Sequence, residues 1–243
     1  MNFSSLKEFC IKNNIDFNYK NVVNSTMDFA KNHNSNINSI YICNKQNSGR
    51  GRPGNKWLGE SGNIFFTLKL FPNKQLHDFF IIGLLACTQI KDVINQYNIK
   101  EVYLKWPNDI YIKDNKVGGV IIETFETFCL VGIGINLISS PKIIDKKTTF
   151  LKKYNKMIEI DSFMINFLIL FINSYLKWNN NINFKFINEY KKSLMYINKM
   201  IRIKNYQNNI ITGKFIDINQ NGHLILEINN KTIIVPSGSM ELA

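Results

Sequence analysis

The stretch Gln46–Trp57, with the sequence QNSGRGRPGNKW, limits what this chain can fold into more than any other. Glycine opens backbone conformations that other residues avoid, so a segment with three glycines is expected to form neither helix nor strand. Arg50 and Arg52 alternate with the glycines, and each guanidinium offers a planar set of donors that suits a carboxylate or a phosphate. The sequence therefore predicts a loop that brings two cations and several backbone N–H groups onto an anion.

Two familiar phosphate-binding patterns do not fit this loop. Its glycines match G-x-G-x-x-G, but that fingerprint opens a helix and needs an acidic residue about 20 positions later, where residues 68–71 hold none. A P-loop ends in G-K-[ST], which the stretch lacks. A solvated basic surface loop remains the alternative, because glycine-rich basic turns are ordinary.

Two later stretches favour a ligand-binding loop. Lys105–Asp109 reads KWPND, and Lys116–Glu123 reads KVGGVIIE. Together with GRGRPGNKW, in this order and spacing, they resemble the biotin protein ligases, over most of the chain from about Ser25 to its end. The resemblance implies that ATP adenylates biotin and that biotin is then transferred to one lysine of the biotin carboxyl carrier protein of a biotin-dependent carboxylase.

The resemblance also implies roles for individual residues. Both reactants of the first step are anions, so the task of the protein is positioning and charge neutralisation. The expected catalytic residues are Lys116, which bridges the biotin carboxylate and the α-phosphate, and Arg50 and Arg52, which clamp the acyl-phosphate and the pyrophosphate. The expected biotin contacts are Ser25, Thr26, Met27, Gln46, Gly49, Arg50, Gly51, Arg52, Lys116, Gly118 and Gly119. The expected ATP contacts are Arg50, Arg52, Trp57, Lys105, Asn108, Asp109, Lys116 and Asn136.

Several of these residues also have a possible purely structural role. Ser25 followed by Asp28 is typical of a helix N-cap, and Trp57 can anchor the end of the loop in the core. Lys116 can be an exposed hairpin lysine, and Asp109 either acts on a metal or water near the phosphates or caps a turn.

Three residues depart from the pattern of the family. Met27 stands where many members have Asn, and Pro53 and Asn55 stand where basic residues are frequent, which puts the tightness of binding in doubt more than the reaction. ATP implies Mg²⁺, whose ligands are expected to be mostly phosphate oxygens and water. No dedicated metal site is readable, since the three histidines and four cysteines show no ligand spacing.

The periodicity predicts an α+β fold in two domains. Residues 1–196 are expected to form a mixed, mostly antiparallel sheet with helices on one side, as in class II synthetases and biotin ligases, and residues 197–243 a small SH3-like β-barrel. The expected helices are 25–33, 78–97, 161–178 and 184–195; the expected strands are 40–43, 63–71, 102–106, 109–112, 117–124, 128–137, 200–204, 210–218, 223–228 and 231–235. Turns are expected at 114–115 and 207–209.

Composition bounds the alternatives. A net charge of +12 favours anionic partners, so a nucleic-acid-binding protein is an alternative to an enzyme. The lysines are spread along the chain rather than clustered, however, so nucleic acid is not an expected partner. A lipoate–protein ligase and an inactive biotin-binding protein are further alternatives. No apolar run is long enough to span a bilayer, so a cytoplasmic protein without a membrane partner is expected. Only about 24 residues precede Ser25, so no DNA-binding domain is expected, and a homodimer stays open.

Overall fold

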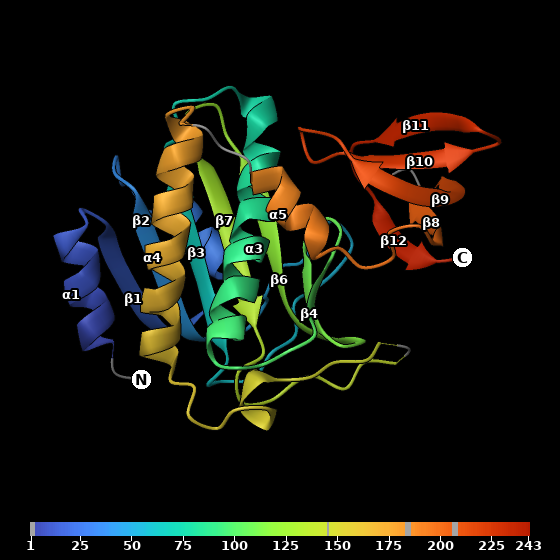
Figure 1. The fold of residues 1–243 in the computed structure, drawn as a ribbon. Coiled ribbons are helices and arrows are strands. Elements are labelled where there is room, and N and C mark those ends of the chain that lie inside the picture. The colour runs from blue at the N-terminus through green and yellow to red at the C-terminus, as the bar shows by residue number, and fades with distance from the viewer. Residues whose placement is uncertain (1–2, 145, 183–185, 206–208) are drawn as a thin grey trace.

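A seven-stranded sheet forms the larger part of the molecule (Figure 1). The computed structural model describes residues 3–144, 146–182, 186–205 and 209–243. The strands, in spatial order, are β1 (Asp16–Val23), β2 (Ser39–Gln46), β3 (Ile64–Leu70), β7 (Cys129–Ile135), β6 (Asn115–Thr124), β5 (Asp109–Ile112) and β4 (Val102–Lys105). Only β1 and β2 pair in parallel, so the predicted mixed, mostly antiparallel sheet is confirmed.

One face of this sheet is covered by helices, as the sequence predicts. They are α1 (Ser4–Lys12), α3 (Phe80–Gln96), α4 (Ile160–Asn179) and α5 (Phe186–Lys192), and Figure 1 shows α3 and α4 lying over the sheet, roughly along its strands. The short helix α2 (Thr26–Lys31) is different, because its Met27 and Ala30 pack with Tyr41 and Leu130 in a separate apolar cluster. Helix α2 thus lies on the other face of the sheet, and the rest of that face is largely open for a site.

Helix α4 is, among the described residues, the one helix long and apolar enough to cross a membrane by length and composition. Its aromatic side chains are instead buried in the core of the protein. Phe163, Phe167 and Phe171 are buried, and the ring of Phe167 lies 5.5 Å from that of Phe66 on the sheet. Burial of such rings against a sheet accounts for the apolar composition of this helix.

Of four local predictions, one is confirmed, two are wrong in detail, and one lies outside the described residues. Ser25 is the N-cap of α2 as expected, and its hydroxyl accepts from the Met27 N–H at 3.2 Å. Asp161 does not cap α4, whose N-cap is Glu159; its carboxylate accepts from the Leu6 N–H of α1 at 3.1 Å instead. The β5–β6 turn is 113–114 rather than 114–115, and the start of the helix predicted at 184 lies outside the described residues.

The C-terminal part is an all-β unit, as predicted. Its strands, in spatial order, are β11 (Lys231–Val235), β10 (Leu224–Ile228), β9 (Ile210–Ile218), β8 (Met200–Lys204) and β12 (Ser239–Leu242), all antiparallel. Within the described residues β11 and β12 do not pair, so the strands form an open sheet and not a closed barrel. Strand β12 was not predicted, because SMEL lacks the β-branched residues typical of strands. The expected turn at 207–209 falls mostly outside the described residues.

The two sheets are joined by specific contacts around Gly222. The carbonyl of Gly222 accepts from the indole N–H of buried Trp106 at 2.9 Å, and its Cα faces Leu84 and Phe80 of α3. Nearby, Lys191 of α5 pairs with Asp217 of β9 at 2.8 Å. These contacts hold the C-terminal sheet beside β4 and α3. The division of the chain at 196/197 stays a prediction.

Gly222→Ala is expected to destabilise the protein markedly. Gly222 has φ +78°, and an added Cβ would lie 2.3 Å from Leu84 Cδ1, so backbone strain and overpacking combine. We expect the free energy of unfolding to fall by about 2–5 kcal/mol, measured by urea titration. Gly54→Ala is the matched control, because Gly54 has φ +83° and nothing within 4 Å of an added Cβ. An equal loss in both variants would contradict the packing role of Gly222.

Candidate active site

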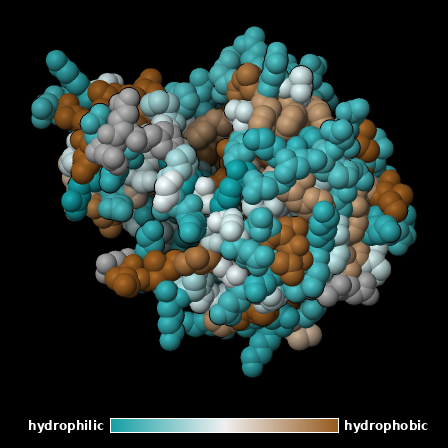
Figure 2. All heavy atoms as spheres, turned by 180° about the vertical axis from the view of Figure 1, so that it is seen from behind, coloured by the Kyte–Doolittle hydropathy of each residue, from teal (hydrophilic) through white to brown (hydrophobic). Residues whose placement is uncertain are grey.

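A cavity of about 450 Å³ opens on the face of the large sheet opposite α3 and α4. Figure 2 shows this face, which is hollowed between the C-terminal sheet and the larger sheet. Its wall is formed by residues of the glycine–arginine loop 46–57, the start of α2, strands β5 to β7, the described part of the segment 141–148, and Ser239 of β12. Segments far apart in sequence therefore meet in one site.

Glycines make the floor of the cavity. A Cβ on Gly134 of β7 would lie 2.4 Å from Cε2 of Trp57, and one on Gly119 of β6 would lie 3.2 Å from its Cζ3. A Cβ on Gly132 would lie 2.6 Å from the sulfur of Met27. Bare backbone thus lets Trp57 and Met27 lie directly on the strands. The alternating glycines of the sequence GIGIN, residues 132–136, are the sequence signal for this floor, which was not predicted.

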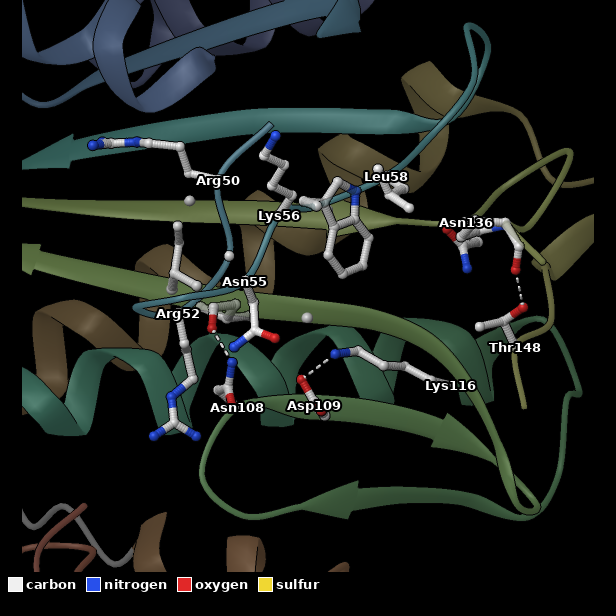
Figure 3. A pocket seen from close by; sticks show the side chains of 18 of the residues that line it. Arg50, Arg52, Asn55, Lys56, Leu58, Asn108, Asp109, Lys116, Asn136 and Thr148 are labelled. Atoms are coloured by element: carbon white, nitrogen blue, oxygen red, sulfur yellow. Dashed lines mark hydrogen bonds and ion pairs between the residues drawn. The ribbon is translucent and has the colours of Figure 1, made fainter. Parts of the chain in front are cut away.

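Lys116, at the start of β6, is paired with Asp109, at the start of β5. The distance from Lys116 Nζ to Asp109 Oδ1 is 2.6 Å, and Nζ lies 5.5 Å from the centre of the Trp57 ring (Figure 3). The Lys116 side chain is 28% exposed and faces the cavity. A lysine held this way presents a fixed positive charge to an entering anion.

A second lysine of the cavity is desolvated. Burial lowers the pKa of Lys105, on β4, below its usual range, while Asp109 and Glu241 act in the opposite direction. Lys146, from the segment 141–148, also lines the cavity and lowers the pKa of Lys105 further. Several cations therefore crowd this end of the cavity, an arrangement that an anionic ligand would relieve.

The Lys105 charge is expected to cost stability at neutral pH. Its folded pKa is lower than the value of about 10.4 in an unfolded chain, so the unfolded state binds more protons between the two values and stability rises with pH there. Lys105→Met should therefore be more stable than the parent at neutral pH, by a margin that shrinks as the pH approaches about 10.4. Urea titrations at several pH values measure this margin, with exposed Lys100→Met as the control. A margin that grows with pH would contradict the desolvation.

The two loop arginines line the cavity but extend away from Lys116 (Figure 3). Arg50 Nη2 lies 2.9 Å from Glu123 Oε1 of β6, and Nη1 lies 3.4 Å from Asp28 Oδ1 of α2. Arg52 donates from Nη1 to the Gly238 carbonyl at 2.8 Å. The arginines thus tie the loop to three other segments in this structure, and the predicted clamp on the phosphates stays a prediction.

A neutral polar group occupies the end of the cavity at α2. Gln46 Oε1 accepts from the Thr26 N–H at 2.8 Å and from the Thr26 hydroxyl at 3.2 Å. Ser25 and Met27 line the same end, and no charged side chain belongs to this hydrogen-bonded group. Such a surface suits an uncharged ligand group that both donates and accepts hydrogen bonds.

Two buried polar atoms at the other end have no hydrogen-bond partner among the described residues. They are Nε1 of Trp57 and Oδ1 of Asn136, one donor and one acceptor. Asn136 is held by its own amide, which donates from Nδ2 to the Thr149 carbonyl at 3.0 Å. Unpaired buried polar atoms are rare, and here both belong to residues that line the cavity.

The cavity brings together almost all of the residues singled out from the sequence. Of the predicted site residues, only Gly49 and Gly118 do not line it, because Gly49 lies against the Trp57 backbone and Gly118 within the sheet. The lining residues that were not predicted are Asn55, Lys56, Leu58, Tyr111, Asp114, Val120, Ile121, Gly132, Ile133, Gly134, Pro141, Ile143, Lys146, Lys147, Thr148, Tyr196 and Ser239. Among the described residues no group of three His, Cys, Asp or Glu side chains could hold a metal ion.

Comparison with known families identifies two matches along the chain. Residues 19–137 match the model of the biotin/lipoate A/B protein ligase family, and residues 196–242 match the biotin protein ligase C-terminal domain. A biotin–[acetyl-CoA-carboxylase] ligase of Mycobacterium tuberculosis is 22% identical over 206 residues, which are 83% of this chain and 77% of that protein. The bifunctional ligase/repressor BirA of Bacillus subtilis is 25% identical over 238 residues, or 92% of this chain and 73% of that protein.

The same fold is found among solved structures. The biotin protein ligase from Aquifex aeolicus in complex with biotin and ATP superposes with a TM-score of 0.81 at 24% identity, covering 94% of this chain and 99% of that one. The ligase from Leishmania major in complex with biotinyl-5-AMP gives 0.62 at 20% identity, covering 91% and 99%. Both sheets of this chain therefore have counterparts in these folds.

Proposed function

This chain belongs to the biotin protein ligase family, and we propose that it uses ATP to join biotin to one lysine of a biotin carboxyl carrier protein. In the first step a carboxylate oxygen of biotin attacks the α-phosphorus of ATP, which forms biotinyl-5′-AMP and releases pyrophosphate. In the second step the amine of the carrier lysine attacks the acyl carbon, an amide forms, the amine gives up a proton and AMP leaves.

The observation that carries this proposal is the division of one cavity into two chemical ends. The end at α2 offers the neutral Thr26 and Gln46 group, which suits the ureido ring of biotin. The other end gathers Lys116, Lys105 and Lys146, which suit the carboxylate and the phosphates. A substrate that is neutral at its head and anionic at its tail fits this order.

Lys116 is the residue to which we assign the central role. Attack of one anion on another is slow unless a cation lies between them, and preorganised charge in a partly dry site is effective because it needs no reorganisation. Asp109 holds the ammonium at 2.6 Å, and the substrates would take over this contact. Trp57 and Asn136, each with an unpaired polar atom, are the proposed contacts of the adenine.

Mg²⁺ is proposed to enter with ATP rather than to reside in the protein. Within the part of the chain that the structure describes, the acidic side chains that line the cavity are Asp109, which is paired with Lys116, and Asp114. They do not make a protein cage of the kind that holds a resident ion, so phosphate oxygens and water would supply most ligands. The ion would add charge neutralisation at the phosphates, while Lys116 acts at the carboxylate.

The C-terminal unit, residues 197–243, is proposed to complete the ATP end of the site on the catalytic domain 1–196. Ser239 lines the cavity, and the Gly238 carbonyl accepts from Arg52 of the loop at 2.8 Å. The cytoplasm is the proposed site of the reaction, which the four buried, free cysteines support. Whether the protein works as a homodimer stays a prediction.

Transfer to an acceptor tests the proposal. The chain is incubated with ATP, a carrier domain and either biotin or lipoate, and the intact mass of the carrier is measured. Lipoate is included because the matched family covers lipoate ligases as well. We expect one biotin per carrier, none with lipoate, and none on a carrier whose acceptor lysine is replaced by arginine. A lipoate adduct, or no adduct in any mixture, would overturn the assignment.

A further inference from the structure

Thr67 is a buried hydroxyl behind the neutral end of the cavity. It lies in the middle of β3, a strand with the sequence IFFTLKL whose residues are all buried, and its own exposure is 0%. Thr67 does not line the cavity. Its Oγ1 donates to Oγ1 of Thr26 at 2.9 Å, across from β3 to α2. A buried hydroxyl between the apolar residues Phe66 and Leu68 needs a partner, and this one finds it in a residue of the site.

The contact fixes the direction of a chain of hydrogen bonds. A hydroxyl has one proton to donate. The Thr26 hydroxyl donates its proton to Gln46 Oε1 and accepts the proton of Thr67, so the order is Thr67 to Thr26 to Gln46. Gln46 Oε1 also accepts the Thr26 N–H, which fills its two lone pairs.

The polarity of the cavity end follows from this order. Gln46 lines the cavity, and with its oxygen occupied it has only its amide Nε2, a pure donor, left to offer a ligand. Thr26 Oγ1 keeps one unused lone pair and therefore presents an acceptor beside that donor. A cyclic urea shows the complementary pattern, a carbonyl acceptor next to N–H donors.

We propose that Thr67 is a positioning residue for biotin, which acts through Thr26 and Gln46 without touching the substrate. The inference rests on the proposed function and adds a residue that determines how the ureido ring is recognised. Without the Thr67 hydroxyl, Thr26 can rotate and the donor–acceptor order of the site is no longer unique. Discrimination by hydrogen bonds depends on such order, because a mismatched pair leaves buried polar groups unpaired.

The test compares three variants in biotin-dependent ATP–pyrophosphate exchange. Thr67→Val removes the hydroxyl at nearly constant volume, and Thr67→Ser keeps it. Thr88→Val is the matched control, since Thr88 is also buried but donates only to the Leu84 carbonyl within α3. We expect Thr67→Val to raise the KM for biotin about fivefold to tenfold, with kcat and the KM for ATP within about twofold of the parent. Thr67→Ser and Thr88→Val should keep the parental KM for biotin.

Each other outcome decides against the inference. An unchanged KM for biotin in Thr67→Val, or an equal rise in Thr88→Val, would show that Thr67 only supports the fold. Failure of Thr67→Ser to restore the parental KM would do the same. If circular dichroism shows that Thr67→Val is unfolded, Thr67→Ala carries the same expectation. A parent protein without biotin-dependent exchange would overturn the proposed function itself, which separates the two failures.

Discussion

Lys116→Ala is expected to lower biotin-dependent ATP–pyrophosphate exchange by a factor of about 10²–10³ while the fold is kept. The lysine belongs to the charged end of the cavity and is held 2.6 Å from Asp109 and 5.5 Å from the centre of the Trp57 ring. Its loss removes the charge that lets the carboxylate approach the α-phosphate. The fold should survive, because the side chain is partly exposed and lines the cavity.

Lys113→Ala is the matched control for this variant. Lys113 lies at the turn of the same β5–β6 hairpin, and its exposed side chain pairs with Glu101 at 3.4 Å, outside the cavity. It removes one positive charge from the same hairpin and should leave the exchange rate near that of the parent. Exchange by Lys116→Ala within tenfold of the parent would remove this lysine from the mechanism.

Gly134→Ala is expected to lower the exchange rate by about 10²-fold, the size of effect that a misplacement of about 1 Å can have. The added methyl group would lie 2.4 Å from Cε2 and 2.7 Å from Nε1 of Trp57, so the indole must leave its place on the sheet. Trp57 also ends the glycine–arginine loop, since its N–H donates to the Gly49 carbonyl at 2.9 Å. The variant should therefore disturb both the proposed adenine contact and the position of the loop.

A double-mutant cycle separates this clash from a general effect on β7. In a Trp57→Ala background the methyl group of Gly134→Ala meets no indole, so the second substitution should have little further effect on the exchange rate. Strong non-additivity is the expected result for residues in direct contact. Losses that simply multiply would contradict the seating of Trp57 on Gly134.

Those parts of the site that carry chemistry were predictable from the sequence. Three segments combine residue types that a purely structural loop does not need: the glycine–arginine loop, KWPND and the lysine before Gly118. These segments predicted the lining of the cavity from the sequence alone. Regular elements with a strong pattern were predictable as well, because α3 places apolar residues at helical spacing and β3 is a continuous run of strand-forming residues that are all buried.

Other features depend on partners far away in the chain. The ion pairs of Arg50 with Asp28 and Glu123 join three segments, and no local pattern of the loop reveals them. The described residues of the segment 141–148 belong to no named helix or strand, yet the Thr149 N–H donates to the Lys116 carbonyl at 2.9 Å, next to residues of this segment that line the cavity. Strand β12 is held by its pairing with β8 rather than by its own propensity.

The central claim is that one cavity of this chain makes an acyl-adenylate from biotin and ATP. The most direct measurement is a single-turnover reaction without any carrier protein, in which the products bound to the chain are identified by mass spectrometry. The account predicts biotinyl-5′-AMP and pyrophosphate in equal amounts in the parent and neither in Lys116→Ala. Cleavage of ATP to ADP and phosphate, or the absence of biotinyl-5′-AMP from the parent reaction, would contradict it.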